Sequence, residues 1–156
     1  MSTAEDSRTA IDRNEANRHL AEISAVERIR WGVAQFGDGA VLLSSMQKTS
    51  SILMHMMAEL NLTNEILFVD TGYHFHETLL IRDEFMRRYR LNIVTLYPKH
   101  TPEAQEHLYG RKLFLFKDGQ PQCCELRKEQ PFIGHMRQQG HRLALDKARE
   151  IANKQQ

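Results

Sequence analysis

A group of small hydroxylated side chains, the serine loop of residues 44–51, follows a short apolar segment in the first third of the chain. Apolar residues then recur at helical spacing from residue 52, so the pattern predicts a strand, a loop and a helix. Such a loop can bind phosphate, because free backbone NH groups and the positive end of the helix dipole face the anion and hydroxyl groups add donors. The simpler alternative is that the serines only cap the helix. The candidate ligands are Ser44, Ser45, Lys48, Thr49, Ser50 and Ser51.

The two cysteines of the chain, Cys123 and Cys124, are adjacent. A disulfide between neighbours would close a strained ring and stabilise the fold little, because its effect grows with the length of the closed loop. We therefore interpret the pair as ligands of a metal or cluster, or as a redox pair, in a reducing compartment. A zinc site made by this pair and two of His107, His135 and His141 fits less well, since zinc-binding cysteines are usually roughly two to four residues apart.

A second polar group follows a second apolar segment. Residues 65–69 predict a strand, which ends on Asp70, Thr71 and Gly72. Open α/β sheets bind their ligands at the carboxyl ends of parallel strands. We therefore expect these three residues to lie beside the serine loop and to share its binding site.

The elements that must position these groups alternate along the chain. Strands are predicted over residues 40–43, 65–69 and 92–97, and helices over residues 24–36, 52–60, 75–90, 101–107, 123–128 and 142–154. The β-α-β-α-β order with short connections predicts a parallel sheet with right-handed crossovers. Ser24 and Glu27 form a capping-box pattern, and we expect Pro131 to kink or break the helix that starts at residue 123.

Length and charge limit the classes of function. A chain of 156 residues can bury the core of one domain, and we expect a polar N-terminal segment over residues 1–19 and a single α/β domain with C-terminal helices over residues 20–156. With 21 basic and 20 acidic side chains, the charge gives no sign of nucleic-acid or membrane partners. We find no signal-peptide pattern and no stretch of roughly 18 apolar residues, so the expected location is the cytoplasm.

The order of these motifs resembles the assimilatory sulfonucleotide reductases, more closely the enzymes that use adenylyl sulfate (APS) than those that use its 3′-phosphorylated form (PAPS). The most specific block is Cys123-Cys124-Glu-Leu-Arg-Lys128, because the cysteine pair marks the iron–sulfur enzymes of that family. The resemblance implies a three-layer α/β fold with a mostly parallel sheet of adenine-nucleotide α-hydrolase-like (PP-loop) topology, shortened at the C-terminal end. The similar segments are residues 24–31, 36–38, the serine loop, 70–72, 75, 77–78 and 123–128.

The resemblance also implies a reaction, the reduction of APS to sulfite and AMP. A thiolate would attack the sulfate sulfur, and thioredoxin or glutathione would resolve the thiosulfonate. Residues 45–51 would hold the phosphosulfate or the α-phosphate of an adenine nucleotide, and Asp70, Thr71 and Gly72 would line the nucleotide pocket.

A cluster is implied by the same resemblance. Cys123 and Cys124 would supply two of the four thiolates of a [4Fe–4S] cluster, which is an incomplete ligand set in one chain. Arg127 and Lys128 would place positive charge near the sulfate and the cluster, where the leaving AMP gathers negative charge.

The chain departs from the family pattern at three places. Gln47 stands where the family loop, Ser-x-Gly, has a glycine that lets the backbone approach a phosphate, so the anion is either pushed out or contacts Lys48 and the helix end. His76 stands where the family has a proline. After Lys128 we find no counterpart of the family's later strand, its second cysteine pair or its tail with the nucleophilic cysteine.

These departures leave two hypotheses. An active enzyme would be a homo-oligomer whose cluster is bridged between two copies, since a two-fold axis brings Cys123 and Cys124 of both chains together. Alternatively, the chain is a truncated, catalytically incomplete paralogue that acts as a nucleotide-binding or partner-binding module, with a vestigial cysteine pair. The enzyme should carry iron or reactive cysteines, and the module should show neither.

Overall fold

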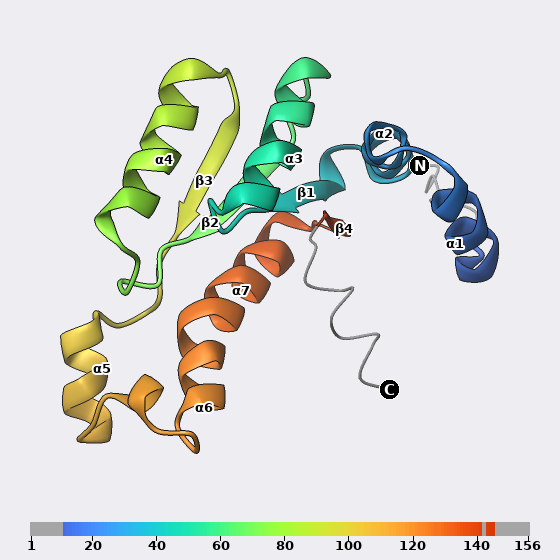
Figure 1. The fold of residues 1–156 in the computed structure, drawn as a ribbon. Helices are drawn as coiled ribbons and strands as arrows, with labels where there is room; N and C mark the ends of the chain where they lie inside the picture. The colour runs from blue at the N-terminus through green and yellow to red at the C-terminus, as the bar shows by residue number, and fades with distance from the viewer. Residues whose placement is uncertain (1–10, 142, 146–156) are drawn as a thin grey trace, which may run out of the picture.

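Four parallel strands form one sheet in the order β3-β2-β1-β4 (Figure 1). The computed structural model describes residues 11–141 and 143–145. Leu42 of β1 lies opposite Ile66 of β2, and Ala40 of β1 lies opposite Leu143 of β4. The three predicted strands are confirmed. The strands are β1 (Ala40–Leu43), β2 (Glu65–Val69), β3 (Asn92–Leu96) and β4 (Leu143–Leu145).

Side-chain caps start two of the predicted helices. Ser24 and Glu27 make the reciprocal hydrogen bonds of a capping box, and the hydroxyl of Thr101 accepts from the NH group of Ala104 at 3.2 Å. The domain boundary expected at residue 20 falls inside the first helix. No helix in the described part of the chain is long and apolar enough to cross a membrane. The helices are α1 (Arg13–Glu22), α2 (Ala25–Phe36), α3 (Lys48–Glu59), α4 (His76–Arg88), α5 (Pro102–Tyr109), α6 (Gln120–Cys124) and α7 (Gln130–Gln139).

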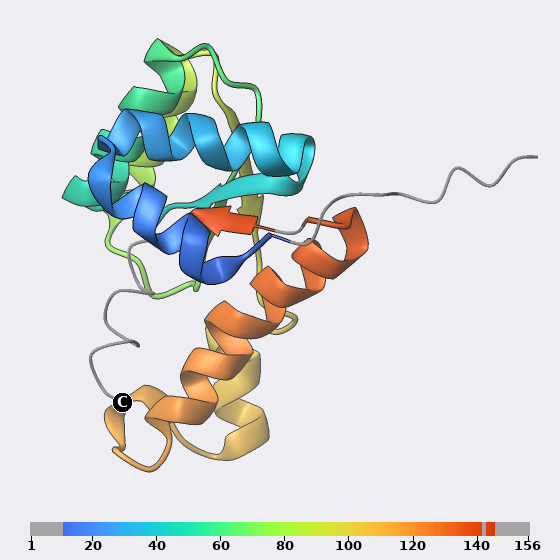
Figure 2. The same cartoon turned by 90° about the vertical axis from the view of Figure 1, so that its right-hand side faces the viewer.

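The helices form a layer on each face of the sheet, as the three-layer prediction requires. Helices α3 and α4 lie on one side of the strands and α7 on the other (Figure 1), and α2 lies beside β4 and β1 (Figure 2). Along β2, Ile66 and Phe68 join the core under α3 and α4, whereas Leu67 points to the opposite face. All three are fully buried, so the sheet is covered on both sides.

The helix predicted from residue 142 is wrong where the structure describes it. Leu143–Leu145 is a strand parallel to β1, so the expectation that no later strand follows Lys128 is also wrong. A Leu-Ala-Leu segment favours a helix by local propensity, but pairing with β1 satisfies its backbone groups and overrides that preference. Residues 146–154 of the predicted helix lie outside the described residues. Because β2 and β4 flank β1, the strand order reverses at β1.

Pro131 does not break the last long helix. A π-helical turn, Glu125–Glu129, joins α6 to α7, and the NH group of Gln130 bonds to the carbonyl of Glu125, five residues back. A proline ring normally clashes with the carbonyl four residues before it. The wider π turn gives room for the ring, and the helix therefore continues to Gly140, which ends it in the left-handed conformation with φ 68°.

Replacing Asn64 by alanine should lower the free energy of unfolding by about 1–3 kcal/mol. The carboxamide of this buried residue donates to the carbonyls of Gly37 and Ala40, both at 2.9 Å, and thereby holds the turn before β1. Urea denaturation would measure the loss. The matched change at exposed Asn14 on α1 should stay within about 0.5 kcal/mol. Equal effects of Asn64→Ala and Asn14→Ala would contradict this role.

Candidate functional site

A cavity of about 700 Å³ opens at the carboxyl ends of β1 and β2, which we call the loop cavity. Its volume is in the range of small-molecule sites, roughly 300–1,000 Å³. It lies at the strand where the order of the sheet reverses, which is where open α/β sheets bind ligands. Of the predicted site residues, the structure places Ser44, Ser45, Lys48, Thr49, Ser50, Thr71 and Lys128 in its wall.

The amino end of α3 faces this cavity without a side-chain cap. The N-cap residue is Gln47, whose side chain makes no capping hydrogen bond, and the first bond from the helix goes from the NH group of Ser51 to the carbonyl of Gln47. The NH groups of the first helical turn are therefore without helical acceptors, and they can donate to an anion. The side chains of Lys48 and Thr49 are exposed at the same point.

Three of the predicted hydroxyl ligands shape the loop itself. Ser44 is buried and accepts from the NH group of Met46 at 3.1 Å, while Ser50 and Ser51 each donate to the carbonyl of Gln47 at 3.0 Å. Met46 takes the left-handed conformation, φ 57°, next to the position where the resemblance expects a glycine. The capping alternative is therefore wrong, because no serine hydroxyl among the described residues accepts from an NH group at the start of α3. The exposed residues with hydroxyl groups are Ser45 and Thr49.

The three predicted residues after β2, Asp70, Thr71 and Gly72, differ in whether they line the loop cavity. Asp70 and Gly72 lie outside the wall of the loop cavity, because the carboxylate of Asp70 turns back to accept from the NH group of Gly72 at 2.9 Å. Thr71 is buried and lines the cavity. Gly72 has φ +76° and packs against Pro102 and Arg127. Only Thr71 of the three predicted residues therefore faces the cavity.

A second cavity of about 580 Å³ lies beside the first, and we call it the cysteine cavity. Cys123 and Cys124 line it, and both are free thiols. Cys123 is 8% exposed and receives a contact from the side-chain NH₂ of Gln105 at 3.9 Å, whereas Cys124 is exposed. The two cavities share four residues of their walls, namely Thr71, Tyr73, His74 and Lys128.

Arg127 lies in the wall of the cysteine cavity and is buried, with 2% of its surface exposed. Its guanidinium donates to the carbonyl of Thr71 at 2.5 Å, to the carbonyl of His100 at 3.1 Å and to the side-chain oxygen of Gln105 at 3.0 Å. It also lies 5.1 Å from the ring centre of Tyr73. Its hydrogen-bond acceptors in the described part of the chain are neutral, so its charge contributes a positive potential to both cavities.

The zinc alternative built on the cysteines does not agree with the structure. His135 and His141 contact Glu65 and not the cysteines, and His107 is exposed on α5. The shared carboxylate of Glu65 was not found from the sequence, because it lies 70 and 76 residues from the two histidines. His74 lies at the cavity wall and bonds through its Nε2 to the carbonyl of Val69 at 3.0 Å.

The family model for the phosphoadenosine phosphosulfate reductase domain matches residues 39–154. The chain belongs to this reductase family. It is 36% identical to an adenosine 5′-phosphosulfate reductase of Mycolicibacterium smegmatis, over 87% of this chain and 55% of that protein. It is 37% identical to the same kind of reductase from Streptomyces coelicolor, over 74% of this chain and 48% of that protein. The reductase-family chain thus spans about half the length of these relatives.

A solved structure supports the fold of this reductase-family domain. The crystal structure of phosphoadenylyl-sulfate reductase from Candida auris, a phosphate complex, matches with a TM-score of 0.74. The match covers 86% of this chain and 67% of that chain, at 19% sequence identity. The predicted α/β architecture is therefore confirmed.

The cysteine pair of this reductase-family domain fits half of the ligand set of a four-iron cluster. Such clusters are held by four thiolates, and both cysteines line the same cavity as the buried cation Arg127. The 156 residues contain two cysteines, so a set of four thiolates would need two more from outside these residues.

Replacing Gly72 by alanine should destabilise the domain more than replacing Gly110. A Cβ at Gly72 would lie 2.8 Å from Cγ of Pro102 and 3.1 Å from Nη2 of Arg127, whereas a Cβ at Gly110 meets nothing within 4 Å. Both glycines have positive φ, +76° and +67°, so both changes carry a conformational cost of about 1–2 kcal/mol. Crowding at Gly72 should add at least about 1 kcal/mol.

Urea denaturation of both variants would measure this difference. Equal losses of stability would show that Gly72 is needed for its backbone conformation alone and not for the contact with Arg127.

Proposed function

We propose that this domain binds adenylyl sulfate or a related adenine nucleotide and takes part in the reduction of its sulfate group to sulfite, with AMP as the second product. One observation carries the proposal. The loop cavity, with its uncapped helix end, adjoins the cysteine cavity through a shared wall that includes Lys128. The relatives named adenosine 5′-phosphosulfate reductase give the substrate class.

The nucleotide's phosphate would lie at the amino end of α3. The free NH groups of the first turn and the side chains of Ser45, Lys48 and Thr49 offer donors to it. The sulfate would extend toward the wall that the two cavities share. Lys128 lies in that wall, and the buried charge of Arg127 stabilises the negative charge that develops on the leaving AMP.

The reaction requires two thiols. The first thiolate attacks the sulfate sulfur, the bond from that sulfur to the phosphate oxygen breaks, and AMP leaves with the electron pair. A second thiol, as its thiolate, then attacks the sulfur that came from the first thiolate. The bond from that sulfur to the sulfonate breaks, sulfite leaves with the electron pair, and a disulfide between the two thiols remains. We propose thioredoxin or glutathione as the source of the second thiol. If both cysteines bind a cluster, the first thiolate also comes from outside these 156 residues.

We further propose that Cys123 and Cys124 are thiolate ligands of a [4Fe–4S] cluster, which would lie beside the positive charges of Arg127 and Lys128 in the same cavity wall. A homo-oligomer with a two-fold axis can complete the ligand set, because the same cavity of both copies would face the axis. Exposed Cys124 is accessible for such a contact. We propose that the protein works in a reducing compartment such as the cytoplasm, where thiols stay reduced.

Anaerobically purified protein should contain about two irons and two acid-labile sulfides per chain, since one four-iron cluster is shared by two chains. Cys123→Ser and Cys124→Ser should each lose the iron while the fold is retained, as circular dichroism would show. Gel filtration of the iron-loaded protein should give a dimer. Iron-free protein after anaerobic purification would contradict the cluster and would favour the nucleotide-binding module.

Replacing Lys128 by glutamine should weaken the binding of adenylyl sulfate by a factor of about 10 to 150, because a charge-assisted hydrogen bond contributes roughly 1.5–3 kcal/mol. Binding of AMP, which has no sulfate, should change little. Isothermal titration without a thiol reductant would measure both ligands. Lys117→Gln is the matched control, since Lys117 is exposed and lies outside both cavity walls. Equal weakening of both ligands would place Lys128 at the phosphate instead.

A further inference from the structure

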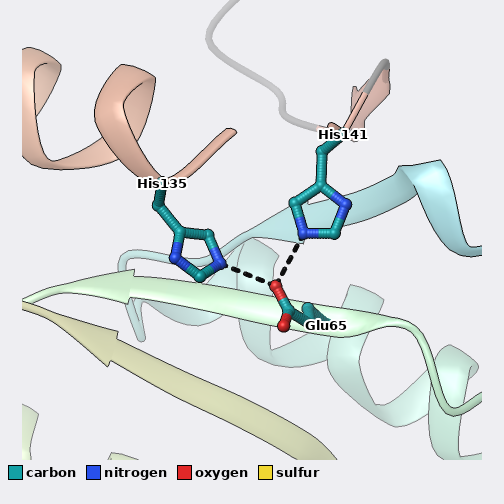
Figure 3. Close-up of side chains that lie close together, drawn as sticks. All are labelled: Glu65, His135 and His141. Atoms are coloured by element: carbon teal, nitrogen blue, oxygen red, sulfur yellow. Dashed lines mark hydrogen bonds and ion pairs between the residues drawn. The ribbon is translucent and has the colours of Figure 1, made fainter. Parts of the chain in front are cut away.

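Glu65, His135 and His141 converge at the end of the sheet opposite to the loop cavity (Figure 3). Glu65 is the first residue of β2, His135 lies on α7, and His141 precedes β4. The Nε2 atoms of both histidines lie 2.8 Å from the same carboxylate oxygen, Oε2 of Glu65. Three separate elements thus direct one ligand atom each toward a common point.

The local structure explains why these side chains meet. Side chains alternate along a strand, so Glu65 shares the face of Leu67, which is the face that α7 covers. Gly140 ends α7 in the left-handed conformation and turns the chain back, which brings His141 beside the ring of His135 with 5.7 Å between ring centres. The side chains are 24%, 14% and 9% exposed for Glu65, His135 and His141. Their orientation is therefore fixed by packing on at least one side.

We propose that Glu65, His135 and His141 form a Zn²⁺ site that ties α7 and the start of β4 to the sheet. Imidazole nitrogen and carboxylate oxygen are both zinc ligands, and two histidines with one glutamate are a known ligand set that leaves a fourth position for water. The three ligand atoms lie within 4.8 Å of one another. This site is separate from the nucleotide and cysteine cavities, and it does not depend on the proposed function.

The distances fit a metal after a small movement. Bonds of about 2.0–2.2 Å in a tetrahedral arrangement separate neighbouring ligand atoms by about 3.4 Å. The two nitrogen-to-oxygen distances are now 2.8 Å, which is the length of a hydrogen bond. Each must therefore open by about half an ångström to admit zinc, and the two Nε2 atoms, which lie within 4.8 Å of each other, must take the same separation of about 3.4 Å. Side-chain rotation can provide such shifts.

Without a metal, the side chains of Glu65, His135 and His141 form hydrogen bonds with one another. One oxygen of Glu65 accepts from two Nε2–H groups, so both rings carry a proton on the atom that faces the carboxylate. Burial opposes ionisation of Glu65, but the hydrogen bonds from His135 and His141 outweigh it and lower the pKa of the carboxyl group. Zinc binding through Nε2 requires these protons to be replaced by the metal, and the carboxylate charge favours that exchange.

The position of the site indicates a structural role. The site lies at the amino end of β2, where parallel sheets do not place their catalytic groups. Cys124 and His135 are separated by eleven residues of nearly continuous helix, or about 17 Å along its axis. A metal at this point would fasten the edge strand β4 and the end of α7, which meet the sheet far from Glu65 in the sequence.

Zinc titration of the full chain tests the proposal, with Cys123→Ser and Cys124→Ser in the background to remove competing thiolates. We expect one zinc per chain and a rise in Tm of about 5–10 °C at a zinc concentration a hundredfold above the Kd, reversed by a chelator. Glu65→Gln, His135→Gln and His141→Gln should each weaken binding at least about 100-fold. His107→Gln, at an exposed histidine on α5, should leave the affinity unchanged.

Cobalt titration of the chain with Cys123→Ser and Cys124→Ser requires no substitution at the proposed zinc site. It therefore tests the site even if a variant of Glu65, His135 or His141 fails to fold. We expect the visible absorption of four-coordinate cobalt with nitrogen and oxygen ligands. The absence of binding, or zinc affinity that all three site variants retain, would overturn the proposal. The same titration of the unsubstituted chain would reveal cobalt–thiolate absorption if the cysteines bind metal, so failure here is distinguishable from failure of the iron measurement.

Discussion

The guanidinium group of Arg127 donates hydrogen bonds to three parts of the chain, the segment after β2, the segment before α5 and the side chain of Gln105 on α5. A buried charge loses several kcal/mol of hydration, and it is tolerated only where such partners replace the water. The carbonyls that accept from it are therefore held at fixed positions. Since Thr71 lines both cavities, this one cation fixes a part of the wall that the two cavities share.

The serine loop balances two demands on its hydroxyl groups. The hydroxyl groups of Ser44, Ser50 and Ser51 make hydrogen bonds within the loop and stabilise its conformation. Ser45 and Thr49 are exposed. The left-handed turn at Met46 is stabilised because its side chain is buried in the core. The helix end is consequently open to an anion even though Gln47 occupies the position of the expected glycine.

Local sequence patterns were sufficient to predict β1, β2 and β3, the caps at Ser24 and Thr101, and the loop beside the cavity. Features that depend on distant partners were not predictable. β4 exists because β1 offers it backbone groups, and the Glu65 cluster needs residues 70 or more positions apart. Burial of Arg127 was also missed, because a Cys-Cys-x-x-Arg-Lys segment does not show which cation points inward. The family resemblance was sufficient to predict the fold, but it did not predict where individual side chains lie.

The π turn at Glu125–Glu129 sets the angular phase between the two ends of the long helix. In an uninterrupted α-helix, Cys123 and His135 would point about 120° apart, because each residue turns the helix by about 100°. One residue absorbed in the wide turn reduces that angle to about 20°. Cys123 in the cysteine cavity and His135 in the Glu65 cluster thus point to the same side of the joined helix. A residue inserted or deleted between them would rotate one site relative to the other by about 100°.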